Sequence, residues 1–335
     1  MAVLARISTV NKQWRRLCSN PELYKHVKIY GLLPAGALQW LAPRAGKIES
    51  LSFSNLVAAV GCAQPPLHVG SFGPDPRFPK PAQFRHLFAP DPAAYMRGLE
   101  AVLQACTHSL NSILLSAVSS VFSQGILGMF ARHSPNLKCI KLEENQFAGA
   151  HGGLCQIAAG CPLVERFSIS EMEYNMEDEN SSLNDNTMGE LVFHWRNLRH
   201  FSVDRNAITL QGLCLLRHCE NLQTLYIGYL RDCGDQFFER FPAPDSMILS
   251  RSVKDIVIDV PAITVSGTIR PLVLLCPNVE DIDIVHEEWS WDDDEGVLDN
   301  HEDLAVLQQE YPKIVFKRFG EPFNIVAERI QDDCD

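Results

Sequence analysis

The sequence predicts an α/β solenoid, in which each short repeat contributes one strand and one helix. The first observation is a recurring pattern of an apolar residue, here named the anchor, followed by apolar residues three and five positions later. The second is an apolar stripe of helical period that ends three residues before most anchors. The third is spacing, because the anchors from Leu110 onward are 27, 27, 34, 24, 31 and 26 residues apart. A unit of that size cannot bury its own apolar face, so neighbouring units must stack.

The strands are predicted at the anchors, because the last two apolar positions alternate with polar residues as in a half-buried strand. The pattern begins at Ile48, Leu110, Leu137, Val164, Leu198, Leu222, Val253 and Val279. Tyr24-Val27-Ile29 has the same form, and Tyr311-Ile314-Phe316 matches it more loosely. We therefore expect about nine or ten strands in a parallel sheet that lines a concave face, with the helices on the convex side.

The helices are predicted immediately before the strands. The clearest stripe precedes the anchor Val164 and comprises Leu154, Ile157, Ala158 and Cys161. Equivalent stripes precede Ile48, Leu198, Leu222 and Val279, and one precedes Leu110 with a turn one residue longer. Cysteines 161, 219 and 276 fall where the helix ends, and a small apolar side chain fills such a corner. The 11 cysteines include no Cys-x-x-Cys pair, which favours structural roles over zinc or redox roles.

The unit length is close to that of leucine-rich repeats or slightly above it. We therefore expect a leucine-rich-repeat solenoid over residues 31–320, followed by a carboxy-terminal cap or tail over 321–335. Two inserts interrupt the array: residues 63–92, which contain eight prolines, and the acidic, polar residues 171–186. Proline donates no backbone hydrogen bond to a sheet, so we interpret the first insert as an excursion, with a binding loop as the alternative.

The amino terminus predicts a helix of its own. Leu4, Ile7, Val10, Trp14 and Leu17 lie on one helical face. This helix should end near Asn20-Pro21, because the residue before a proline disfavours the helical region. Leu23, Tyr24 and the strand-like segment HVKIYG follow.

This segment, LARISTVNKQWRRLCSNPELYKHVKIYG, resembles the second half of an F-box. The matching residues are Leu4, Val10, Trp14, Arg15, Leu17, Pro21, Leu23 and Tyr24. Its junction with helix-and-strand repeats makes the chain similar to the F-box/leucine-rich-repeat family. The family's Cys-Pro-Asn-Leu corner resembles Cys276-Pro277-Asn278-Val279, Cys161-Pro162-Leu163-Val164 and Cys219-Glu220-Asn221-Leu222. The Leu-Pro-led first half of the F-box is missing, so residues 1–30 are expected to form a partial, helical F-box-like cap.

The resemblance implies a function in ubiquitin transfer. The chain is expected to be the substrate-recognition subunit of a Skp–cullin–F-box E3 ubiquitin ligase, and to bind its substrate on the concave face. The resemblance places Val10, Trp14, Leu17, Leu23 and Tyr24 either against the Skp-family adaptor or in the packing of the cap. Because half of the F-box is missing, adaptor and cullin binding by this form stays an open expectation.

A second interpretation of the amino terminus remains open. Trp14, Leu17, Cys18 and Pro21 before Tyr24 reproduce the stripe of the repeats themselves, so the segment could be a capping repeat. Trp14 then belongs to the core. The corresponding alternative function is a leucine-rich-repeat scaffold or inhibitor that mediates protein–protein interaction without any part in ubiquitin transfer.

Composition excludes several classes of protein. The formal net charge is −12 and the sequence pI is about 5.4, which argues against binding to nucleic acid or to an anionic membrane. No apolar run approaches the roughly 20 residues of a membrane-spanning helix, and the start lacks a secretory leader pattern. We therefore expect an intracellular protein, cytoplasmic, nuclear or both.

The sequence predicts no enzyme, no cofactor and no metal site. It has no phosphate-binding glycine loop, no Gly-x-Ser-x-Gly and no His-Glu-x-x-His. His151-Gly152-Gly153 resembles half of an esterase oxyanion loop, but the nucleophile is missing and a glycine turn explains it. The acidic run from Asp292 to Glu295 lacks the alternating spacing of a calcium loop.

Binding is expected on the concave face, which receives the side chains two, four and six residues after each anchor. The early repeats offer Ser50, Ser52, Ser54, Ser112 and Ser116, and the middle repeats offer Lys141, Glu143, Arg166, His200, Asp204 and Tyr226. The late repeats offer Asp255, Asp259, Asp281 and Asp283, and then a loop with Trp289 and Trp291. The candidate substrate-binding residues are those from His200 onward.

Charge is uneven along the chain. Residues 1–47 contain eight Lys or Arg and one Glu, whereas residues 251–335 contain 20 Asp or Glu and seven Lys or Arg. Such acidic runs are often simply solvated surfaces. The alternative, which we carry forward as a hypothesis, is that the late concave surface binds a basic segment of a protein partner.

Overall fold

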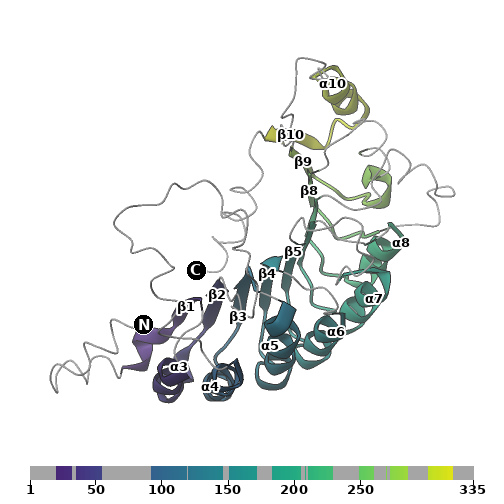
Figure 1. The fold of residues 1–335 in the computed structure, drawn as a ribbon. Helices are drawn as coiled ribbons and strands as arrows, with labels where there is room; N and C mark the ends of the chain where they lie inside the picture. The colour runs from purple at the N-terminus through teal and green to yellow at the C-terminus, as the bar shows by residue number, and fades with distance from the viewer. Residues whose placement is uncertain are drawn as a thin grey trace, which may run out of the picture.

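The computed structural model describes residues 20–31, 35–54, 92–118, 120–145, 151–171, 183–204, 208, 210–228, 249–259, 269, 272–285 and 301–319. These residues contain ten strands that form one parallel sheet in chain order (Figure 1). The strands are β1 (His26–Tyr30), β2 (Ser50–Ser54), β3 (Ser112–Ser116), β4 (Cys139–Asn145), β5 (Arg166–Glu171), β6 (His200–Asp204), β7 (Thr224–Ile227), β8 (Asp255–Asp259), β9 (Asp281–Val285) and β10 (Val315–Phe319).

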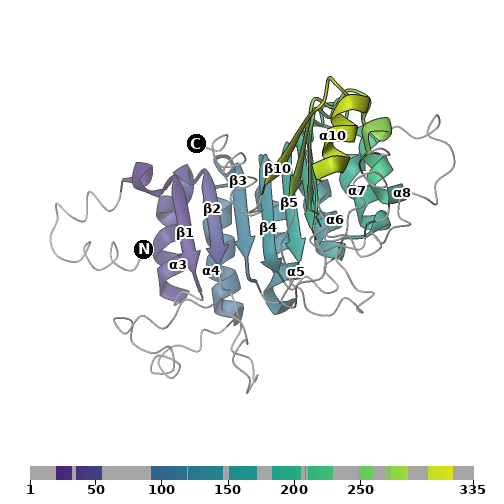
Figure 2. The same cartoon turned by 90° about the horizontal axis from the view of Figure 1, so that it is seen from above.

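Helices connect the strands and lie along the convex side of the curved sheet (Figures 1 and 2). The α-helices are α3 (Ala35–Leu41), α4 (Pro92–Ala105), α5 (Ser120–His133), α6 (His151–Gly160), α7 (Asp185–His194), α8 (Leu210–Leu213) and α10 (His301–Glu310). The 3-10 helices are η1 (Pro21–Tyr24), η2 (Ala42–Lys47) and η4 (Cys214–His218). The predicted α/β class is therefore confirmed, as is a parallel sheet with a solenoid-like order.

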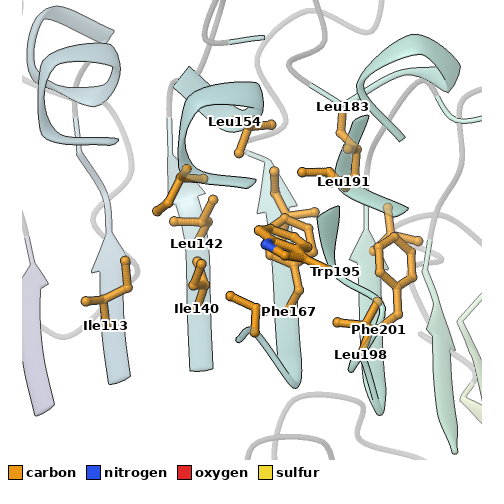
Figure 3. Packing of buried hydrophobic residues seen from close by; sticks show 14 of the residues in the cluster. Ile113, Ile140, Leu142, Leu154, Phe167, Leu183, Leu191, Trp195, Leu198 and Phe201 are labelled. Atoms are coloured by element: carbon orange, nitrogen blue, oxygen red, sulfur yellow. The ribbon is translucent and has the colours of Figure 1, made fainter. Parts of the chain in front are cut away.

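The core lies between the sheet and the helices. The residues three and five positions after each anchor face the helices, as Ile113 and Leu115 do, and both are fully buried. Large aromatic rings fill the middle of this core: the Phe167 ring centroid lies 4.9 Å from that of Trp195 and 5.9 Å from that of Phe201 (Figure 3). Because apolar side chains alternate with polar ones, the opposite face of the sheet is left polar.

The corner residue, three positions before each anchor, links each repeat to the one before it. Its own carbonyl accepts the anchor N–H, as in Leu198 to Trp195 and Leu222 to Cys219. At three successive corners the side chain also donates to the corner carbonyl of the preceding repeat. These bonds run from Cys161 to Ser134 (3.2 Å), from Trp195 to Cys161 (3.0 Å) and from Cys219 to Trp195 (3.7 Å).

The corner cysteines are structural. Burial raises the pKa of the Cys161 and Cys276 thiols to about 12, and that of Cys219 to about 11. A thiol that stays protonated is a poor nucleophile and a poor metal ligand. The predicted role as a small buried side chain at the corner fits this environment.

The last repeat is offset from the predicted pattern. The Tyr311 N–H donates to Leu307, and the Ile314 N–H donates to Tyr311, which are the bonds of a corner and an anchor. Phe316 then pairs with Ile282 of β9. The prediction that Tyr311 is the anchor was therefore wrong, because an aromatic corner residue three positions before an apolar anchor mimics the start of the strand pattern.

The inserts are shorter than predicted where the structure describes their ends. Pro92, the last residue of the predicted proline-rich insert, begins α4, while residues 63–91 lie outside the described residues. Leu183 is fully buried, and the Asn184 side chain accepts the Thr187 N–H at 3.0 Å to cap α7. The end of the predicted acidic insert therefore belongs to a repeat. In the described part of the chain, no helix is both long enough and apolar enough to cross a membrane.

Candidate protein-binding surface on the concave face

The strand register aligns the concave side chains in rows that cross the sheet. The first row contains His26, Ser50, Ser112, Cys139, Arg166, His200, Thr224, Asp255, Asp281 and Val315. The second row contains Lys28, Ser52, Leu114, Lys141, Ser168, Ser202, Tyr226, Val257, Asp283 and Lys317. Adjacent members of a row lie about 4.8 Å apart, the distance between neighbouring strands.

The register brings several predicted site residues together. His200, Tyr226, Asp255, Asp281 and Asp283 all lie in these two rows. Asp204 lies one step further along β6, and Asp259 ends β8, although its side chain is outside the described residues. Trp289 and Trp291 are also outside the described residues.

Charge divides sharply along the two rows. From β1 to β7, their described residues carry Lys28, Lys141 and Arg166, two histidines and no carboxylate. On β8 and β9 they carry Asp255, Asp281 and Asp283. The change of sign falls between β7 and β8, beside the neutral side chains of Thr224 and Tyr226.

The acidic end of the surface already holds an ammonium group. The Nζ of Lys317 on β10 lies 2.8 Å from Asp281 and 4.0 Å from the carboxylate of Asp283. Asp283 is only 1% exposed, whereas the side chain of Asp281 is 31% exposed. Asp255 and Asp281 are therefore the accessible carboxylates of these two strands. Asp283 is buried beneath Lys317. Sequence reasoning missed Lys317, although its place in the alternating segment VFKRF was a usable signal.

Asp204 is held inside the protein surface. It is 8% exposed, and the Ser170 hydroxyl lies 3.5 Å from its carboxylate. The backbone of Gly228 approaches it closely, so a Cβ at position 228 would collide with the Asp204 carboxylate. We conclude that Asp204 shapes the junction of β6 and β7 more than it presents charge to a partner.

The predicted adaptor-side residues are only partly described. Val10, Trp14 and Leu17 lie outside the described residues. Tyr24 is 1% exposed and packs edge-on against Trp40, with ring centroids 6.0 Å apart. Leu23, in contrast, is 53% exposed. The structure thus places Tyr24 in the packing of the first repeat and Leu23 on the surface.

A groove of about 910 Å³ runs along the edge of the sheet, over the corners that lead into β7 to β10. Its lining includes Gln223, Lys254, Asn278, Glu280 and Lys313. Lys254 and Glu280 form an ion pair of 2.7 Å, and the Asn278 amide donates to the Arg251 carbonyl. Charges of both signs alternate here, so the groove favours no particular ligand. It depends on how successive corners stack, which the sequence pattern does not show.

Comparison with known proteins adds no relative to this description. No protein-family model matches the chain, and no curated protein sequence matches it significantly.

Proposed function

We propose that the chain is a recognition protein that binds a protein partner on the concave face of a leucine-rich-repeat solenoid. The assignment of leucine-rich repeats is supported by the phase between helix and strand, and by the repeated corner bonds. The observation that carries the function is the division of charge along the first two rows of the concave face; in the next row, β4 carries the partly exposed Glu143. The described helices pack on the opposite face, so that ten strands present a continuous surface.

The partner would offer a basic segment to β8 and β9. Asp255 and Asp281 are partly exposed and adjacent in the first row, and Lys317 shows how an ammonium group fits beside Asp281. A lysine or arginine of the partner would make a similar charge-assisted bond. Tyr226 and Val315 border this site and would add apolar contact.

The finer proposal is that the chain is a substrate-recognition subunit of a Skp–cullin–F-box E3 ubiquitin ligase. It rests on the resemblance of residues 1–30 to an F-box, and on a surface that suits a protein substrate. No residue of this chain would perform chemistry, because holding the substrate near the transferring enzyme raises the effective concentration of the reacting groups. The exposed Leu23 would be a point of contact with the adaptor.

One observation favours the alternative, a scaffold or inhibitor without a role in ubiquitin transfer. Tyr24 occupies the anchor position of β1, and Val27 and Ile29 are buried in the common core. The segment around Tyr24 therefore forms the first repeat of the solenoid, with or without a contact to the Skp-family adaptor.

Affinity purification of the full-length chain from cells tests the ligase proposal. Recovery of Skp and cullin is expected, and it should fall in the variant Leu23→Asp. The matched control is Leu163→Asp, at a position that is 42% exposed on another repeat. If neither Skp nor cullin is recovered with the unaltered chain, the scaffold function is favoured instead.

A further inference from the structure

We infer that the partner segment is dipolar, with an acidic block over β4 to β6 and a basic block over β8 and β9. This inference rests on the proposed function, because it concerns the same surface and the same partner. It adds a second recognition element, of opposite charge, and it fixes the distance between the two.

The cationic element consists of Lys141 and Arg166, and His200 lies beside Arg166. Arg166 pairs with His200 in the first row, and Lys141 lies in the second row on the strand before Arg166. All three are partly exposed. Ser168 follows Lys141 in the second row and is partly exposed, whereas Ser202 beyond it is buried. Hydroxyl groups next to cationic side chains can donate hydrogen bonds to a carboxylate, so the group suits an acidic segment.

The register gives the spacing of the two blocks. Three and a half strand intervals separate β5 from the midpoint of β8 and β9, which corresponds to about 17 Å at about 4.8 Å for each interval. An extended peptide rises about 3.3 Å for each residue, so the centres of the two blocks lie about five residues apart. The intervening residues would cross Thr224 and Tyr226, which carry no charge.

A segment of one charge fits this surface poorly. A wholly basic segment that spans the sheet meets Lys141 and Arg166, and a wholly acidic one meets Asp255 and Asp281. Like charges brought together across an interface cost binding free energy, and such repulsion is a common source of specificity. The division of charge therefore selects a partner in which the sign also changes.

Fluorescent peptides bound to the full chain at low salt test the inference. The dipolar peptide carries a block of glutamates and a block of lysines with centres about five residues apart, and it is made in both orders. The basic peptide replaces each glutamate with glutamine, and the acidic peptide replaces each lysine with glutamine. We expect one order of the dipolar peptide to bind about tenfold tighter than the basic peptide.

The variant Lys141→Glu/Arg166→Glu should weaken binding of the dipolar peptide below that of the basic one, because the glutamates of the peptide then meet glutamates of the protein, and should strengthen binding of the basic one. The variant Lys141→Gln/Arg166→Gln should remove only the preference, and serves if the reversed charges impair folding. The control, Arg132→Glu/Arg196→Glu, makes the same change of charge outside the concave rows, at positions exposed to solvent.

The outcomes separate the inference from the proposed function. If the basic and dipolar peptides bind equally, the inference that the partner carries an acidic block is overturned, and the proposed recognition of a basic segment stands. If only the acidic peptide binds, the proposed recognition of a basic segment is overturned, and so is the inference of a dipolar partner. If no peptide binds, both the inference and the charge-based part of the proposed function are overturned.

Discussion

The Trp195 indole N–H donates a hydrogen bond to the Cys161 carbonyl, 3.0 Å away, and so joins two successive corners of the solenoid. The indole is fully buried and also packs against Phe167. Trp195 is thus both the largest member of the corner series and one of the largest side chains of the core.

Replacement of Trp195 by Phe should lower the free energy of unfolding by about 2–4 kcal/mol, because it leaves a buried carbonyl unsatisfied and opens a void. Urea denaturation followed by circular dichroism measures the change. Phe193→Leu is the control, since Phe193 lies two residues before Trp195, in the last turn of α7, but is 65% exposed, and its replacement should change stability little. Equal loss in the two variants would contradict the structural role of the indole.

Removal of the Ser134 hydroxyl should stabilise the protein. Ser134 is fully buried, and its Oγ has no hydrogen-bond partner within the described residues. An unsatisfied buried hydroxyl costs about 1–3 kcal/mol, so Ser134→Ala should raise the free energy of unfolding by about 1 kcal/mol. In the comparison variant Ser109→Ala, a hydroxyl that bonds the Ile48 carbonyl at 2.7 Å is lost, and stability should fall. A lower midpoint for Ser134→Ala would show that this hydroxyl is satisfied.

Stability should decrease as the pH rises above about 9. The pKa of the Cys161 and Cys276 thiols is about 12 in the folded protein, whereas free thiols ionise near 8.5. The unfolded chain therefore releases thiol protons that the folded protein keeps, so the contribution is full below about pH 8.5 and is lost between there and pH 12. Urea midpoints measured from pH 7 to pH 10 should fall less steeply in Cys161→Ala than in the unaltered chain. Identical slopes would contradict the burial of this thiol.

Replacement of Lys317 by Gln should strengthen binding of a basic peptide by several fold, because the substitution removes the ammonium group that neutralises Asp281. The pair with Asp281 is partly exposed and should contribute little to stability, but the buried Asp283 also loses its ion pair, so the free energy of unfolding should fall as well. Titration of the basic peptide into both proteins at two salt concentrations measures the effect, which should shrink at the higher concentration. Weaker binding after the substitution would mean that Lys317 itself contacts the partner.

The repeating part of this structure could be predicted from sequence because two periods are locked together. The strands after Leu110, Val164 and Val279 lie where the apolar alternation places them. The prediction for the last repeat failed because Tyr311 is an apolar corner residue. The pattern alone does not distinguish a corner residue from an anchor residue. Contacts between strands were beyond the pattern altogether. The ion pair between Lys317 and Asp283 depends on the strand register, and the groove beside Lys254 depends on how the repeats stack. Only the assembled sheet determines both.

The corner bonds have a direction. From Cys161 to Ser134, Trp195 to Cys161 and Cys219 to Trp195, each side chain donates toward the amino terminus. A chain that ends after the repeat of Trp195 keeps the Cys161 and Trp195 donors with their acceptors, whereas a chain that starts at the repeat of Trp195 leaves the indole N–H without its acceptor. The two ends of the solenoid should therefore respond differently to truncation. Removal of repeats from the carboxy-terminal end should destabilise the remaining repeats less than removal from the amino-terminal end.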